Sequence, residues 1–153
     1  MKSAFALMGF LVLTFLAPVA GALAAPGDWY HSLAKPTWTP PSWLFGSAWT
    51  FLYLGMAVAA WGVWRKVGWS APIYWWLFQL ILNAAWMPLF FGLRQPGWAF
   101  AEILLLWAAI AMTLVQFFKI ARWAGVFMVP YLAWVTFASV LNCVIWRMNP
   151  QLP

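Results

Sequence analysis

The chain has 153 residues, of which 67% are hydrophobic and only 7% are charged, with a formal net charge of +6. Soluble domains carry about 25% charged residues, so this composition excludes an ordinary soluble enzyme and indicates an integral membrane protein. The basic residues lie singly or in pairs near the ends of apolar runs, which is typical of membrane anchoring and argues against a nucleic-acid partner. With one cysteine and one histidine, we expect no internal disulfide, no metal site and no cofactor.

The first apolar run covers residues 4–25 and has two interpretations. A basic start followed by an apolar stretch and Ala22-Leu23-Ala24 resembles a signal peptide with a cleavage site. The run is, however, longer than the apolar core of a signal peptide (about 7–15 residues) and long enough to span about 30 Å of hydrocarbon. We therefore interpret it as a retained first transmembrane helix.

A loop rich in Trp and Pro follows at residues 26–42. Pro36, Pro40 and Pro41 lack a backbone N–H and have a fixed φ, so we expect no ordinary helix before the chain has passed Pro41. The loop consists largely of rigid rings rather than polar side chains. This composition indicates a folded cap that lies on the bilayer surface or over a cavity beneath it.

Four further apolar runs predict transmembrane helices at residues 43–64, 72–93, 98–118 and 123–146. We therefore expect an all-α integral membrane protein, a bundle of five transmembrane helices in one domain of residues 1–153. Five spans place the two termini on opposite sides of the membrane, and the distribution of Lys and Arg favours an inside N-terminus.

The helix expected at 72–93 carries a polar residue in its middle. Trp86 and Phe90 follow Asn83 by three and seven residues, so the three share one helix face. Polar residues in hydrocarbon usually face the interior of a bundle, which points this face inward. Pro88 lies in the next turn and can bend the helix there.

Aromatic residues form stripes on the second and fifth helices as well. Phe45, Trp49 and Tyr53 are spaced by four residues, and Trp134 and Ala138 also share a face. A small residue such as Ala138 between large rings can admit another helix or a flat ligand. Two interpretations are open: the stripes are simple helix packing, or they line an aromatic pocket suited to a large, flat, apolar ligand.

The ionisable residues give no catalytic pair. Asp28 and Glu102 are the only carboxylates, and they lie on different segments with no partner visible in the sequence. We expect Glu102 to reach the membrane interface or to pair with a cation such as Arg94. His31, in the loop, is interpreted as a surface or hydrogen-bonding residue rather than an axial ligand of a metalloporphyrin.

Motifs along nearly the whole chain resemble those of one known family, in order and at its spacing. They are Trp29-Tyr30, Lys35-Pro36, Trp38-x-Pro40-Pro41, Trp49-Thr50-x-Leu52-Tyr53, Gln79-Leu80-x-x-Asn83-x-x-Trp86-x-Pro88-x-Phe90-Phe91-Gly92, Pro130-Tyr131-Leu132-x-Trp134 and Leu141-Asn142. The family is that of the translocator proteins, also called tryptophan-rich sensory proteins or peripheral-type benzodiazepine receptors.

The resemblance implies a bundle of five helices, often a homodimer, with a ligand pocket below the first loop. Family ligands are porphyrins such as protoporphyrin IX, synthetic isoquinoline carboxamides and benzodiazepines, and sterols in animal members. Carried over residue by residue, the implied ligand-binding residues are Tyr30, Phe45, Trp49, Asn83, Trp86, Phe90, Trp134 and Ala138. Trp49 and Trp134 match tryptophans implicated in light-dependent porphyrin breakdown in some bacterial members.

One segment departs from the family pattern. Animal members carry a sterol motif at the end of the fifth helix that requires Tyr, and here Leu141 to Arg147 reads LNCVIWR without one. A porphyrin-type ligand is therefore favoured over a sterol bound through this motif, while a sterol or lipid stays open as a further partner. We expect a multi-pass protein of a bacterial cell envelope membrane.

Three functions follow as hypotheses. The first is binding of tetrapyrroles for transport, sensing or regulation, in which Asn83 and Trp N–H groups, with Lys35 or His31 as further candidates, donate to the porphyrin carboxylates. The second is a light-dependent porphyrin-degrading enzyme, in which Trp49 and Trp134 act and the bound ligand supplies the reactivity. The third is a non-catalytic membrane scaffold or lipid-binding protein. We favour binding without catalysis because the protein side offers no acid/base pair.

Overall fold

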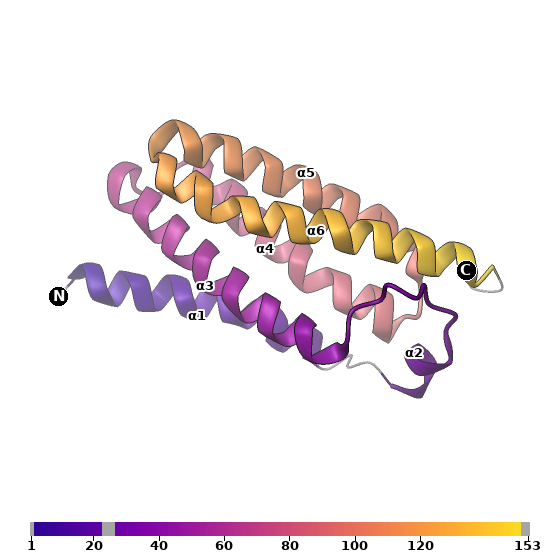
Figure 1. Cartoon of the computed structure of the whole chain (residues 1–153). Helices are drawn as coiled ribbons and strands as arrows, with labels where there is room; N and C mark the ends of the chain where they lie inside the picture. The colour runs from indigo at the N-terminus through magenta and orange to yellow at the C-terminus, as the bar shows by residue number, and fades with distance from the viewer. Residues whose placement is uncertain (1, 23–26, 151–153) are drawn as a thin grey trace.

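The computed structural model describes residues 2–22 and 27–150, and every regular element in this part of the chain is helical (Figure 1). The elements are α1 (Lys2–Ala22), α2 (Asp28–Ser32), α3 (Ser42–Val67), α4 (Ala71–Met87), the π-helical turn η1 (Pro88–Gly92), α5 (Pro96–Ile120) and α6 (Arg122–Met148). The predicted all-α class is confirmed. The short α2 within the loop and the change from α4 to η1 were not predicted.

Prolines and one glycine determine several of these boundaries. The helix α3 begins directly after Pro41, whose φ of −63° already suits a helix start. Pro88 has no N–H to donate to the carbonyl four residues earlier, and the α-helix α4 ends there. Leu93 N donates to the Pro88 carbonyl, five residues before it, at 2.8 Å, and this spacing defines η1. Gly68 (φ 65°) turns the chain between α3 and α4 in a conformation that side chains disfavour.

The long helices pack side by side in a closed ring, which is the bundle (Figure 1). In order around the ring they are α1, α3, α6, α5 and α4, each packed against its two neighbours. The start of α1 and the end of α6 lie at opposite ends of the bundle, and the loop with α2 lies beside the C-terminal end of α6. The basic ends of α3 and α5 meet at the other end of the bundle, where Lys66 Nζ donates to the Ile120 carbonyl at 3.2 Å.

The outer surface of the bundle is that of a membrane protein. The four segments α3, α4 with η1, α5 and α6 are each long and apolar enough to cross a bilayer, and α1 contributes a shorter apolar stretch, Ser3–Val19. Large apolar side chains such as Phe51 and Trp98 are 68% and 69% exposed. An apolar surface of this extent is stable only against lipid, so the chain is an integral, multi-pass membrane protein.

The first helix is part of the core. Phe10 is buried, with ring centroids 5.2 Å from Trp76 and 5.9 Å from Trp64. Thr14 is fully buried as well, and its hydroxyl donates to the Phe10 carbonyl at 2.6 Å. The possible cleavage stretch Ala22-Leu23-Ala24 lies mostly outside the described residues, so retention of the first helix stays a prediction.

The packing of α5 on α6 yields a test of this arrangement. A Cβ atom added at Gly125 would lie 2.3 Å from Phe118 Cγ, which is the root of that ring and cannot move away independently. We expect Gly125→Ala to lower the free energy of unfolding by about 1–3 kcal/mol, because overpacking forces the helices apart. Gly46→Ala is the control, since nothing lies within 4 Å of its added Cβ. Equal melting temperatures of the two variants in detergent would contradict the packing.

Candidate functional site

A hydrogen-bond network joins three helices at the centre of the bundle. The Tyr53 hydroxyl on α3 donates to Asn83 Oδ1 on α4 at 2.8 Å. Asn83 Nδ2 donates to the Tyr131 oxygen on α6 at 3.1 Å, and the Tyr131 hydroxyl donates to Gln79 Oε1 at 2.8 Å. All four residues are buried. The network places Asn83 in the interior, as its position in an apolar run led us to expect.

Two members of this network had no assigned role in the sequence analysis. Gln79 lies four residues before Asn83, on the same face of α4, and this spacing was a signal that could have identified it. Tyr131 is fully buried and both accepts and donates a hydrogen bond, so it is the central member. No pattern on α6 indicated which helix its hydroxyl would meet.

A second polar link fixes the loop end of the bundle. Trp86 Nε1 donates to Asn142 Oδ1 at 3.1 Å, and Asn142 Nδ2 donates to the Pro96 carbonyl at 2.8 Å. Asn142 thereby ties α4, α5 and α6 together. Because its only indole N–H is engaged, the orientation of the Trp86 ring is fixed.

Tyr30 and the rings of α4 and η1 form what we call the loop-side cluster: Trp29, Tyr30, Trp86, Phe90 and Phe91. Trp86 stacks on Phe90 with ring centroids 5.0 Å apart, and Tyr30 meets Phe91 edge-on at 5.3 Å. Partial burial raises the pKa of the Tyr30 phenol above its usual value. The Tyr30 hydroxyl therefore stays protonated at neutral pH and remains a hydrogen-bond donor.

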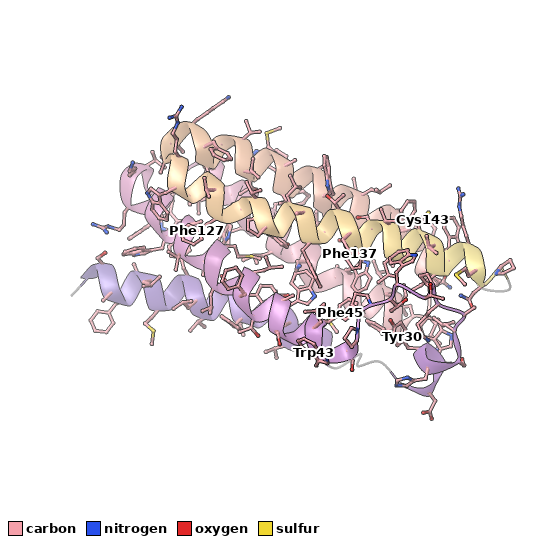
Figure 2. The ribbon with its side chains drawn as sticks, viewed as in Figure 1. Tyr30, Trp43, Phe45, Phe127, Phe137 and Cys143 are labelled. Atoms are coloured by element: carbon pink, nitrogen blue, oxygen red, sulfur yellow. The ribbon has the colours of Figure 1, made fainter. Side chains whose placement is uncertain are left out.

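A second group of rings lies across the seam between α3 and α6. Phe45 meets Trp134 edge-on at 5.7 Å, and Trp134 also lies 5.7 Å from Phe137. Figure 2 shows Phe45 on α3 and Phe137 on α6 toward the end of the bundle that carries the loop. One turn further along these helices, Trp49 stacks on Tyr53 at 5.2 Å. This group is called the seam cluster: Phe45, Trp49, Trp134 and Phe137.

The loop is tied to the bundle by a residue that the sequence analysis missed. Asn149, just beyond α6, accepts a hydrogen bond from Ala34 N at 3.0 Å and donates to the Ala34 carbonyl at 2.9 Å. Lys35 lies next to this attachment, and its Nζ donates to the carbonyls of Tyr30 at 2.6 Å and Leu33 at 3.0 Å. The Lys35 ammonium thus closes the end of α2, and its hydrogen bonds are already in use. Arg94 is exposed, with its guanidinium 6.0 Å from the Trp29 ring.

The expectation for Glu102 was wrong. Its side chain is 9% exposed, and neither carboxyl oxygen has a hydrogen-bond partner among the described residues. The rotation of α5 turns this carboxyl into the bundle, whereas Arg94 is exposed to solvent. Packing of α5 between α4 and α6 overrides the preference of an isolated carboxylate for the membrane interface.

The residues implied by the family resemblance thus fall into three connected groups. Tyr30, Trp86 and Phe90 belong to the loop-side cluster, and Asn83 to the network at the centre. Phe45, Trp49 and Trp134 belong to the seam cluster, and half-buried Ala138 packs against the core on the same helix as Trp134. A groove lies between α3 and α6, and Trp134 is the member of this set that lines it.

Comparison with known proteins assigns the family. A family model described as "TspO/MBR family" matches residues 7–147. This chain belongs to the TspO/MBR family. Among relatives, the tryptophan-rich sensory protein of Cereibacter sphaeroides is 41% identical over 94% of both chains. The translocator protein of Homo sapiens is 38% identical over 93% of this chain and 89% of its own length. The resemblance inferred from the motifs is confirmed.

A third relative carries a different protein name. Protein CrtK of Rhodobacter capsulatus is 37% identical over 92% of this chain and 91% of its own length. The range that the family model matches, residues 7–147, includes the residues of both clusters and of the central network.

The central network predicts which of two tyrosine variants is the less stable. Tyr131→Phe removes one acceptor and one donor and leaves two polar atoms, Asn83 Nδ2 and Gln79 Oε1, without their partner. Tyr53→Phe removes a single donor and leaves only Asn83 Oδ1 without its partner. Each buried polar group left unpaired costs about 1–3 kcal/mol, so Tyr131→Phe should lower the melting temperature more than Tyr53→Phe. The measurement is thermal unfolding of both variants in the same detergent. A larger loss for Tyr53→Phe would contradict the network.

Proposed function

We propose that this protein binds porphyrins such as protoporphyrin IX in an aromatic pocket, for transport, sensing or regulation of tetrapyrroles. In this proposal five transmembrane helices form a single domain, and two copies form a homodimer. Membership of the TspO/MBR family supports the proposal, and the observation that carries it is the meeting of two aromatic clusters around a few paired polar groups. Porphyrin macrocycles stack on indole and phenyl faces, which such clusters supply.

The porphyrin carboxylates need donors at the loop end of the bundle. Arg94 is suited to this role, because it is exposed beside Trp29 and a guanidinium pairs with a carboxylate through two hydrogen bonds. The protonated Tyr30 hydroxyl is a second donor. Lys35 is less suitable than the sequence suggested, because its ammonium already donates to backbone carbonyls. His31 is exposed and stays a candidate.

Other ligands of the pocket are proposed by analogy with the family. Isoquinoline carboxamides and benzodiazepines are flat and largely apolar, so the same rings would accept them. A sterol is less suited to the end of α6. Leu141, Asn142 and Ile145 in this segment are buried within the bundle, which leaves little of it for a sterol at the surface.

Binding can be tested by titrating the purified protein with protoporphyrin IX in the dark while following tryptophan fluorescence. We expect saturable quenching in the wild type. Trp134→Leu should weaken binding by roughly 2- to 10-fold, because it removes an aromatic stacking surface that contributes about 0.5–1.5 kcal/mol. Trp98→Leu is the matched control, since Trp98 is 69% exposed on the outer face of α5. Quenching that never saturates would contradict the proposal and leave the clusters as packing.

Light-driven breakdown of the bound porphyrin is the second candidate function. One observation favours it: Trp49, Tyr53 and Tyr131 are in ring contact, with Trp49 centroids 5.2 Å from Tyr53 and 6.0 Å from Tyr131. Tryptophan and tyrosine side chains are oxidisable, and such a contiguous set can pass an electron to an excited ligand, from which molecular oxygen can then take it. The porphyrin would absorb the light and molecular oxygen would be the oxidant, so the protein need not supply an acid/base pair.

The second candidate has its own test. The complex is illuminated in air, and the porphyrin absorbance is followed against the same sample without oxygen. If breakdown occurs on the protein, the absorbance should fall in the wild type and in Trp98→Phe but persist in Trp49→Phe and Trp134→Phe at saturating ligand. A stable spectrum in the wild type, or equal bleaching in every variant, would leave binding as the function.

A further inference from the structure

A groove runs between α3 and α6 on the face of the bundle that lies against lipid. It consists of two cavities of about 210 and 410 Å³, both lined by Phe51, Leu52 and Pro130. Ala48, Ala133, Trp134 and Phe137 complete the lining of the larger cavity. Its volume falls within the range of about 300–1,000 Å³ that is usual for small-molecule sites. The groove is therefore large enough to admit a flat apolar molecule from the bilayer.

The two helices are close at one end of the groove and apart at the other. A Cβ added at Gly55 would lie 3.7 Å from the Phe127 carbonyl oxygen, so the backbones nearly touch there. Toward the loop, α3 and α6 are bridged instead by the rings of Phe45 and Trp134, whose centroids lie 5.7 Å apart. In Figure 2, Phe127 and Phe137 on α6 mark these two ends. Side chains rather than backbone separate the wider end from the bundle interior.

One of these bridging side chains is not held by a hydrogen bond. Trp134 Nε1 is buried and has no hydrogen-bond partner among the described residues. Trp86 differs, because its Nε1 donates to Asn142. Rotation of the Trp134 ring therefore breaks no hydrogen bond. A passing ligand with a carbonyl or carboxylate would relieve an unpaired donor, whose burial costs about 1–3 kcal/mol.

One backbone hydrogen bond of α6 is missing in the wall of the groove. Pro130 lies inside α6 and cannot donate to the carbonyl of Val126, four residues earlier. Helices bend most readily at such positions. Both residues line the groove, so a small bend of α6 at Pro130 would change its width.

We propose that a flat, membrane-soluble ligand with a hydrogen-bond acceptor passes between the bilayer and the aromatic pocket through the groove between α3 and α6. In this proposal the ring of Trp134 is the gate that opens or blocks the groove. This inference rests on the proposed function, because it needs a ligand that binds inside. The apolar lining and the lipid-facing position favour a solute of the bilayer over one arriving from water. The seam cluster, which shares Trp134 and Phe137 with the groove, is the destination.

The proposal can be tested with variants that fill the groove, by measuring how fast the ligand binds and leaves. Ala133→Phe adds a ring at an exposed position of the larger cavity, and Ala48→Phe adds one at a half-buried position of the opposite wall. Ala108→Phe is the matched control, at an exposed alanine on α5 away from the groove. Each protein is reconstituted in phosphatidylcholine vesicles and mixed with protoporphyrin IX in the dark. Stopped-flow quenching of tryptophan fluorescence gives the association and dissociation rates, and a titration gives Kd.

An obstruction in a route, but not in the site, raises the barrier equally in both directions. We expect both filled variants to bind and release the ligand about tenfold more slowly than Ala108→Phe, with Kd unchanged within about twofold. Rates equal to those of the control would overturn the route while leaving the proposed function intact. A raised Kd with an unchanged association rate would also overturn it, because the groove would then be the site itself. No saturable binding in the wild type would overturn the proposed function.

Discussion

A polar group inside a bundle surrounded by hydrocarbon finds no water, so its hydrogen-bond partners must come from the protein. The centre of this bundle meets that requirement with side chains from three helices. Tyr53 on α3, Asn83 on α4 and Tyr131 on α6 satisfy one another, and Gln79 completes the set. Since each bond joins different helices, the network constrains the rotation of α3, α4 and α6 together. The aromatic clusters on either side keep their positions because these rotations are set.

The aromatic rings differ in how firmly they are held. Trp86 is fixed by Asn142, which also bonds the Pro96 carbonyl at the start of α5, so the contact among α4, α5 and α6 is polar and specific. Across the seam between α3 and α6 the contacts are ring against ring, with a buried indole N–H on Trp134 that has no partner among the described residues. Ring contacts tolerate sliding and rotation more than hydrogen bonds do. One side of the bundle is thus fixed and the other can adapt.

The loop between α1 and α3 joins the two sides. Its backbone at Ala34 pairs with Asn149 through two hydrogen bonds, and buried Leu33 packs with Phe90 and Ile145. The loop is therefore a folded part of the bundle with specific contacts to the end of α6. Trp38 extends it to the seam, where its ring lies 5.8 Å from Phe137. A change in the width of the seam would be transmitted to the loop through this contact.

The sequence by itself determined the membrane class, the places of the long helices and the family. These follow from local properties: apolar run length, proline positions and motif spacing. It also predicted that Asn83, Trp86 and Phe90 share an inward face, because the helical period is local.

Only the tertiary structure decided which side chains meet. The bond from Asn83 to Tyr131 spans 48 residues, and the bond from Ala34 to Asn149 spans 115. Such pairs depend on the order and rotation of helices around the ring, which no single helix encodes. Glu102 illustrates the same limit, since α5 is apolar on nearly every face and its own pattern does not determine which face turns inward. The physical reason is that helix rotation results from packing against all neighbours at once.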